Sequence, residues 1–72
     1  MPPLPALTAK QIEKVLLRNG FGISHQKGSH RRYRDDKGHA VTVAHHPGKT
    51  THPKTTAAII KQSGLTFEHF TK

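Results

Sequence analysis

One histidine and three arginines lie close together in the segment QKGSHRRYR, which spans residues 26–34. His30 follows a Gly-Ser pair and precedes the arginines, and the segment contains no acidic residue. Arginine can bind phosphate oxygens through two parallel hydrogen bonds. Imidazole has an ordinary pKa of about 6.5, so it exchanges protons at neutral pH. Together these residue types could bind a phosphodiester and take a proton from a hydroxyl group, such as the 2′-hydroxyl of RNA.

An extended backbone would place this histidine beside two of the arginines. Successive side chains of a strand point to opposite faces, so His30 shares its face with Arg32 and Arg34. The other face carries Arg31 and Tyr33, and Tyr33 is the only large apolar side chain of the strand. We therefore expect the Tyr33 face to pack on the core and the His30 face to point to water or a ligand. Nearby arginines disfavour the protonated imidazolium, whereas a bound phosphate favours it.

The segment before this strand predicts a helix over residues 8–19. Thr8 and Gln11 have the spacing of a capping box, in which each side chain satisfies a backbone N–H group of the first turn. Gly20 suits the left-handed residue that follows a helix, and Phe21 can then fold back onto the last turn.

Three short strands and a second helix are predicted from the remaining segments. Alternating side chains between turn residues favour strands at residues 21–26, 29–34 and 39–45, with Phe21 and Ile23 on the same side. Proline and glycine at its ends predict a helix over 54–63. Its N-cap could be Thr51, His52 or Thr55, and its apolar residues are Ala57, Ala58, Ile59 and Ile60. A last short turn at 66–70 would bring Phe67 and Phe70 into the core.

These elements predict an α+β fold with the order helix, three-stranded antiparallel sheet, helix. Two amphipathic helices can cover one face of such a sheet and leave the other to water or a ligand. We expect a single domain over residues 8–72. The proline-rich residues 1–7 are expected to form a flexible, extended lead.

The charge of the chain points to a polyanionic partner. Twelve Lys and Arg residues against four Asp and Glu give a net charge of +8 and a pI near 10.5. Such an excess is most typical of nucleic-acid binding, less of a membrane surface or an acidic protein partner, and can also be a plain cationic surface. The first residues lack the pattern of a signal peptide, and no apolar run reaches about 20 residues, so we expect a cytoplasmic protein with no membrane contact.

No metal ion or other cofactor is expected. The chain has no cysteine, which excludes disulfides and thiolate zinc sites. Three histidines could still converge on zinc, although no helical pair fixes them. The candidates are His45, His46 and His52, which are close in sequence, and His25 and His39 on the predicted strands. The carboxylates are scattered along the sequence, which disfavours magnesium. Aromatic residues are few and look committed to the core, so a base-stacking platform is not expected.

Four sequence segments resemble the HicA family of bacterial toxins: NGF at 19–21, QKGSH at 26–30, VTVAHH at 41–46 and AAIIKQSGL at 57–65. The resemblance runs from about residue 8 to residue 70. It implies a fold like the double-stranded-RNA-binding domain and an mRNA interferase, a ribonuclease that cleaves messenger RNA and arrests growth. It also implies a HicB-like antitoxin that covers the site.

The resemblance assigns the catalytic histidine of the Gly-Ser-His element to His30, after a turn at Gly28 and Ser29. The later histidine of the family aligns with His46, although Ala44 replaces the usual proline. We therefore expect a metal-independent endoribonuclease in which His30 is catalytic. The residues expected to contact RNA are Lys27, Gly28, Ser29, Arg31, Arg32, Arg34, His46 and Lys49.

Two points stay open at this level. The general acid that would assist His30 could be Lys27, His25 or His46. The same surface would also suit a non-catalytic RNA-binding module, which binds RNA and leaves it intact, or a protein that only pairs with an acidic partner.

Overall fold

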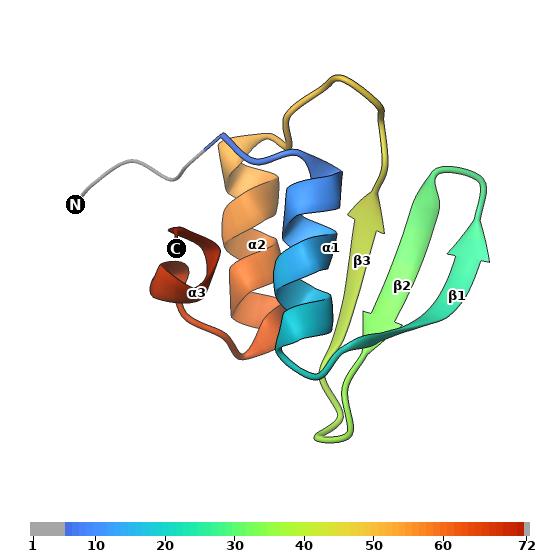
Figure 1. Cartoon of the computed structure of the whole chain (residues 1–72), viewed down its shortest axis with the longest axis vertical. Helices are drawn as coiled ribbons and strands as arrows, with labels where there is room; N and C mark the ends of the chain where they lie inside the picture. Colours follow the sequence, from blue (N-terminus) through green and yellow to red (C-terminus); the bar gives the residue numbers. More distant parts are fainter. Residues whose placement is uncertain (1–5, 72) are drawn as a thin grey trace.

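The computed structural model describes residues 6–71 and shows two layers, a three-stranded antiparallel sheet and a set of helices (Figure 1). The elements in chain order are α1 (Ala9–Arg18), β1 (Gly22–Lys27), β2 (His30–Arg34), β3 (Ala40–Ala44), α2 (Pro53–Ser63) and α3 (Phe67–Thr71). The predicted α+β fold, similar to the double-stranded-RNA-binding domain, is confirmed. Of the expected lead at residues 1–7, residues 1–5 lie outside the described residues, and the division into lead and domain stays a prediction.

Both ends of α1 carry the predicted signals. The Thr8 side chain accepts a hydrogen bond from the Gln11 amide at 3.2 Å, and the Gln11 side chain accepts one from the Thr8 amide at 2.9 Å. After the helix, Gly20 has a φ of 92°, and the Phe21 amide donates to the Leu16 carbonyl at 3.0 Å. The capping box therefore starts this helix, and a left-handed glycine lets the chain turn from it into the sheet.

The sheet has the order β1-β2-β3, with the arginine-rich strand β2 in the middle. Tyr33 pairs with Val41 and Arg31 with Val43, so these side chains share the face that the helices cover. Tyr33, Val41 and Val43 are buried, as the alternation predicted. β1 lies farthest from the helices in Figure 1, and all six of its residues are exposed.

Some apolar residues of β1 and α2 stay outside the core. Ile23 does not accompany Phe21 into the core, because the helices do not reach β1, and Ile23 is 49% exposed. Ala57 and Ala58 point to solvent, since α2 buries Thr56, Ile59 and Ser63 instead. The two buried hydroxyls donate to backbone carbonyls of their own helix, Thr56 to His52 and Ser63 to Ile60, and these bonds offset the cost of burying them.

The C-terminal part of the chain follows the sequence expectations with one further difference. His52 is the N-cap of α2, and its side chain accepts a hydrogen bond from the Lys54 amide at 3.1 Å. The expected last turn forms α3, in which Phe70 is buried but Phe67 is only half-buried. Phe70 alone therefore brings α3 into the core.

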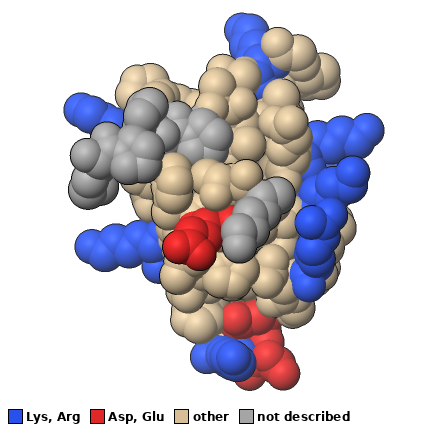
Figure 2. All heavy atoms as spheres, turned by 60° about the vertical axis from the view of Figure 1, so that its left-hand side comes forward, with Lys and Arg blue, Asp and Glu red and all other residues tan. Residues whose placement is uncertain are grey.

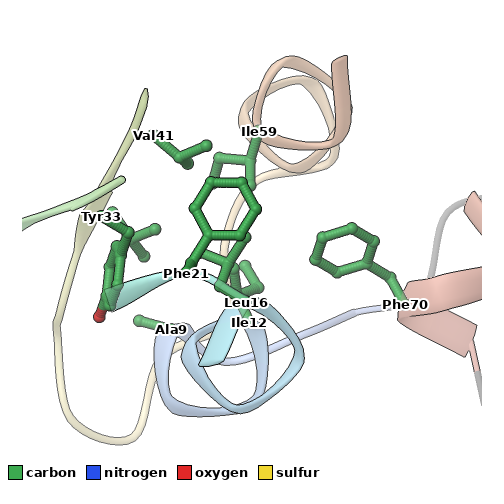
Figure 3. Packing of buried hydrophobic residues seen from close by; sticks show 9 residues of the cluster. Ala9, Ile12, Leu16, Phe21, Tyr33, Val41, Ile59 and Phe70 are labelled. Carbon is green, nitrogen blue, oxygen red and sulfur yellow. The ribbon is translucent and has the colours of Figure 1, made fainter. Parts of the chain in front are cut away.

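The core is a single cluster of nine buried apolar residues (Figure 3): Ala9, Ile12, Leu16, Phe21, Tyr33, Val41, Val43, Ile59 and Phe70. In Figure 3 the ring of Tyr33 lies at one side of this cluster, and its hydroxyl oxygen points away from the centre. A core this small leaves little stability in reserve, as expected for a domain of this length.

Two adjacent leucines of α1 test this assignment of the buried face. Leu16 is fully buried, so Leu16→Ala should lower the free energy of unfolding by about 2–5 kcal/mol. Leu17 is 47% exposed, so Leu17→Ala should change that free energy by no more than about 0.5 kcal/mol. Urea unfolding followed by circular dichroism compares the two variants, and equal losses would contradict the packing described above.

Candidate nucleic-acid interface

The open face of the sheet carries the histidine and arginines singled out from the sequence. His30, Arg32 and Arg34 are all exposed, and they alternate with Arg31 and Tyr33 on the covered face. Lys27 of β1 pairs directly with His30, and His25 pairs with Arg32. Opposite residues of antiparallel strands share a face, with Cβ atoms about 4.5–5.5 Å apart. The open face therefore presents a continuous group of basic side chains around His30.

A tight turn fixes the position of His30 at the start of β2. Gly28 and Ser29 form the two-residue connection between β1 and β2, and Gly28 has a φ of 58°. A positive φ at the first of two turn residues is the requirement of a type II′ turn, which glycine meets without strain. The carbonyl of Ser29 accepts a hydrogen bond from the His45 amide at 2.6 Å. This bond connects the turn to the residue after β3, so the backbone on the N-terminal side of His30 is held by a hydrogen bond.

The other two predicted contact residues lie on the loop between β3 and α2. His46 is exposed two residues beyond Ala44, which pairs with His30. The Lys49 amide donates to the His46 carbonyl at 3.1 Å, and both side chains line a small depression of about 180 Å³ beside α2.

Of the three candidates for a general acid, Lys27 lies directly across from His30. His25 lies one row away on the same face, and His46 lies on this loop.

Arg31 has a different environment from the other arginines of β2. It is half-buried on the covered face, and its Nη1 donates to Oε2 of Glu13 on α1 at 2.8 Å. The Tyr33 hydroxyl donates to the same carboxylate oxygen. His45 Nε2 lies 2.8 Å from the Tyr33 oxygen and 3.7 Å from Glu13 Oε2. These four side chains, Glu13, Arg31, Tyr33 and His45, form a polar cluster between α1 and the sheet.

The polar cluster was not predicted from the sequence. Tyr33 was correctly expected in the core, but no partner was assigned to its hydroxyl, and His45 was considered only as a possible zinc ligand. A signal was present, because a buried tyrosine hydroxyl usually needs a hydrogen-bond partner. Glu13 directly follows the buried Ile12, so it borders the face of α1 that packs on the sheet.

The contacts within the polar cluster set the charges of its members. The hydrogen bond from Tyr33 and the neighbouring Arg31 lower the pKa of Glu13, although partial burial opposes them. Burial, and then the bond to Glu13, raise the pKa of Tyr33. Burial and the charge of Arg31 lower the pKa of His45, with Glu13 opposing. At neutral pH, Glu13 is therefore ionised, Tyr33 keeps its proton and His45 is neutral.

A cleft of about 510 Å³ opens beside the polar cluster. Its walls include Lys10 and Glu13 from α1, Arg31 from β2, and His45, His46 and Gly48 from the loop after β3. The cleft thus lies at the end of the sheet where the Ser29–His45 bond is formed, on the side opposite the open face.

The histidines considered as zinc ligands do not come together. His45 bonds to Tyr33, His52 caps α2, and His46 lies on the loop between them. Within residues 6–71, no three side chains of the types His, Cys, Asp and Glu are arranged to hold a metal ion. None of the helices in this part of the chain is long and apolar enough to cross a membrane.

The fold and the basic open face define a small α+β domain of the double-stranded-RNA-binding type. A family model described as "HicA toxin of bacterial toxin-antitoxin" matches residues 9–65, and the chain belongs to this family. No curated protein matches the chain. Membership implies, in general terms, an antitoxin partner and an RNA target.

The polar cluster can be tested through Tyr33, because it is the only tyrosine of the chain. Tyrosinate absorbance in the near ultraviolet should appear only above the ordinary tyrosine pKa of about 10. Glu13→Gln removes the carboxylate that favours the protonated phenol, so it should lower the pKa of Tyr33, while burial keeps that pKa above its ordinary value. Glu68→Gln, on the exposed surface of α3, is the matched control and should leave the titration unchanged.

The raised pKa of Tyr33 also makes the stability of the fold depend on pH. Since folding raises the pKa of Tyr33, its contribution to stability is full below about pH 10 and is lost as the pH rises above that value. The midpoint of urea unfolding, measured from about pH 8 to about pH 11, should fall with rising pH in the parent. The fall should be smaller in Glu13→Gln. A tyrosine that titrates at its ordinary pKa in the folded protein would contradict the cluster.

Proposed function

We propose that this chain is an endoribonuclease toxin that cleaves messenger RNA without a metal ion, with His30 as the acid/base residue. The observation that carries the proposal is the exposed imidazole of His30 between Lys27 and Arg32 on an uncovered basic face. Family membership adds the toxin role and an RNA target in general. We further propose that the protein acts in the cytoplasm and that a HicB-like antitoxin neutralises it by covering this face.

RNA supplies the nucleophile for this reaction, so the protein needs only to move protons and stabilise charge. His30 takes the proton of a 2′-hydroxyl, and the 2′-oxygen forms a bond to the adjacent phosphorus. The bond from that phosphorus to the 5′-oxygen of the next nucleotide breaks, and the leaving oxygen takes a proton. The products are a 2′,3′-cyclic phosphate and a 5′-hydroxyl end.

The basic neighbours of His30 suit the charge that develops on the phosphate. Arg32 lies two residues along the same face of β2, where its guanidinium can bind phosphate oxygens. Ser29 in the turn can donate a hydrogen bond from its hydroxyl. Lys27, directly across from His30, is the best placed of the three candidates to stabilise or protonate the leaving oxygen.

A non-catalytic RNA-binding module is the second candidate, since the same basic face would bind RNA that is then left intact. Binding alone requires no imidazole beside the Gly-Ser turn. The two functions differ in whether a defined RNA is cut.

The nuclease activity is tested with a His30→Ala protein on a defined RNA in excess chelator. We expect the parent to cleave and the variant to be at least about 100-fold slower, because proton transfer contributes about 10²–10⁴-fold. His69→Ala is the control, since His69 is an exposed histidine on α3 and should be dispensable. Equal rates for His30→Ala and the parent would refute the role of His30, and binding without cleavage by the parent would favour the second candidate.

The phosphate contact of Arg32 is tested through the salt dependence of binding. In a His30→Ala background, where the RNA stays intact, Arg32→Gln should reduce the slope of log K against log salt by about 0.7–1. Arg18→Gln changes an exposed arginine at the end of α1 and should leave the slope unchanged. Identical slopes for both variants would argue against a phosphate at Arg32.

A further inference from the structure

The cleft beside the polar cluster is not used by the reaction at His30. Its volume of about 510 Å³ lies within the range of about 300–1,000 Å³ typical of small-ligand sites. Three of the residues in its walls, Glu13, Arg31 and His45, belong to the polar cluster. A cavity on which a small number of polar groups with shifted pKa values converge is a typical binding site.

The hydrogen bonds of the polar cluster determine which nitrogen of His45 carries the proton. Tyr33 has one hydroxyl hydrogen, and it donates that hydrogen to the ionised Glu13. The Tyr33 oxygen then accepts from His45 Nε2, which lies 2.8 Å away. Because the neutral ring carries one hydrogen, Nδ1 of His45 is left as an acceptor.

This acceptor is accessible to a ligand. Within residues 6–71, Nδ1 of His45 has no hydrogen-bond partner, and it is not among the fully buried atoms that lack one. The His45 side chain is 16% exposed and lines the cleft. A ligand in the cleft would meet His45 at this unpaired nitrogen, since Nε2 is already bonded to Tyr33.

The cleft also offers positive charge that its single carboxylate does not cancel. Glu13 is already bound by Arg31 and Tyr33. Arg31 has five N–H donors, and its side chain is 31% exposed, so donors remain for a second anion. Lys10 is exposed on the adjacent wall. Phosphate is a suitable anion for these two side chains.

Backbone pairing between β2 and β3 places the cleft residue His45 near His30. The Ser29 carbonyl and the His45 amide are bonded at 2.6 Å, and His30 and Ala44 are the next residues along each strand and pair with one another. His30 and His45 thus lie at the same end of the sheet, one on each face. This placement allows one RNA strand to contact both His30 and the cleft by passing around this end of the sheet.

We propose that the cleft is a second RNA subsite, which binds a nucleotide flanking the one cut at His30. Lys10 and Arg31 contact its phosphate, and His45 Nδ1 accepts a hydrogen bond from its base or ribose. The proposal rests on the proposed function. A nucleotide fits better than an acidic side chain of a protein partner, because a carboxylate has no hydrogen to donate to Nδ1. Since bases differ in their donor groups, this contact would also make the cleft a determinant of sequence preference.

The subsite is tested by equilibrium binding of short single-stranded RNAs to variants in a His30→Ala background. Lys10→Ala and His45→Phe should each weaken binding about three- to tenfold, the loss expected for one contact. His45→Phe should also reduce differences in affinity between RNAs of different sequence. Lys14→Ala, one turn further along α1 and outside the cleft, is the matched control and should bind like the parent.

The outcomes separate this proposal from the proposed function. Lys10 is exposed, so Lys10→Ala should leave the fold intact, and a loss of binding in this variant supports the subsite if Lys14→Ala binds normally. Unchanged binding in both cleft variants, with RNA still cleaved by the protein that retains His30, overturns the subsite alone. Weakened binding of the antitoxin with unchanged RNA binding overturns RNA as the occupant. A parent that neither binds nor cuts RNA overturns both proposals.

Discussion

Burial of the Tyr33 ring is the constraint on which the arrangement of the open face depends. Tyr33 is fully buried in the middle strand of the sheet, so the alternation of β2 forces its even-numbered neighbours to the opposite side. A shift of one residue would place His30 and two arginines under the helices and turn the tyrosine to water. The high cost of burying arginine without a partner makes that register unfavourable. The same contact that holds the core together therefore exposes the basic residues.

The Tyr33 hydroxyl extends this constraint to the helical layer. Its bond to Glu13 links β2 to α1, and its contact with His45 links β2 to the loop after β3. Arg31, which the alternation sends to the covered side, is accommodated because Glu13 balances its charge there. One aromatic residue thus positions groups on both sides of the sheet, His30 on the open face and His45 at the cleft. In Figure 2, lysine and arginine side chains project around the outline of the molecule while acidic groups form small patches, in keeping with a surface suited to a polyanion.

Much of the fold could be predicted from short-range signals. The capping box at Thr8 and the turn at Gly28 act within a few residues, so the sequence pattern alone indicates them. The exposed position of His30 followed from period-two alternation. The exposure of Ile23 could not be predicted in this way, because it depends on how far the helices extend across the sheet. The Glu13 contact to Tyr33 joins residues 20 positions apart and depends on how α1 packs on β2, which periodicity does not specify.

Binding of RNA on the open face against His30 can be observed by nuclear magnetic resonance of the histidine rings. The probe is an RNA with 2′-deoxy substitution, which binds but has no hydroxyl to attack the phosphate. We expect the ring signals of His30 to shift in proportion to bound RNA, with those of His69 on α3 unchanged. Unchanged His30 signals in a protein saturated with this RNA would contradict it.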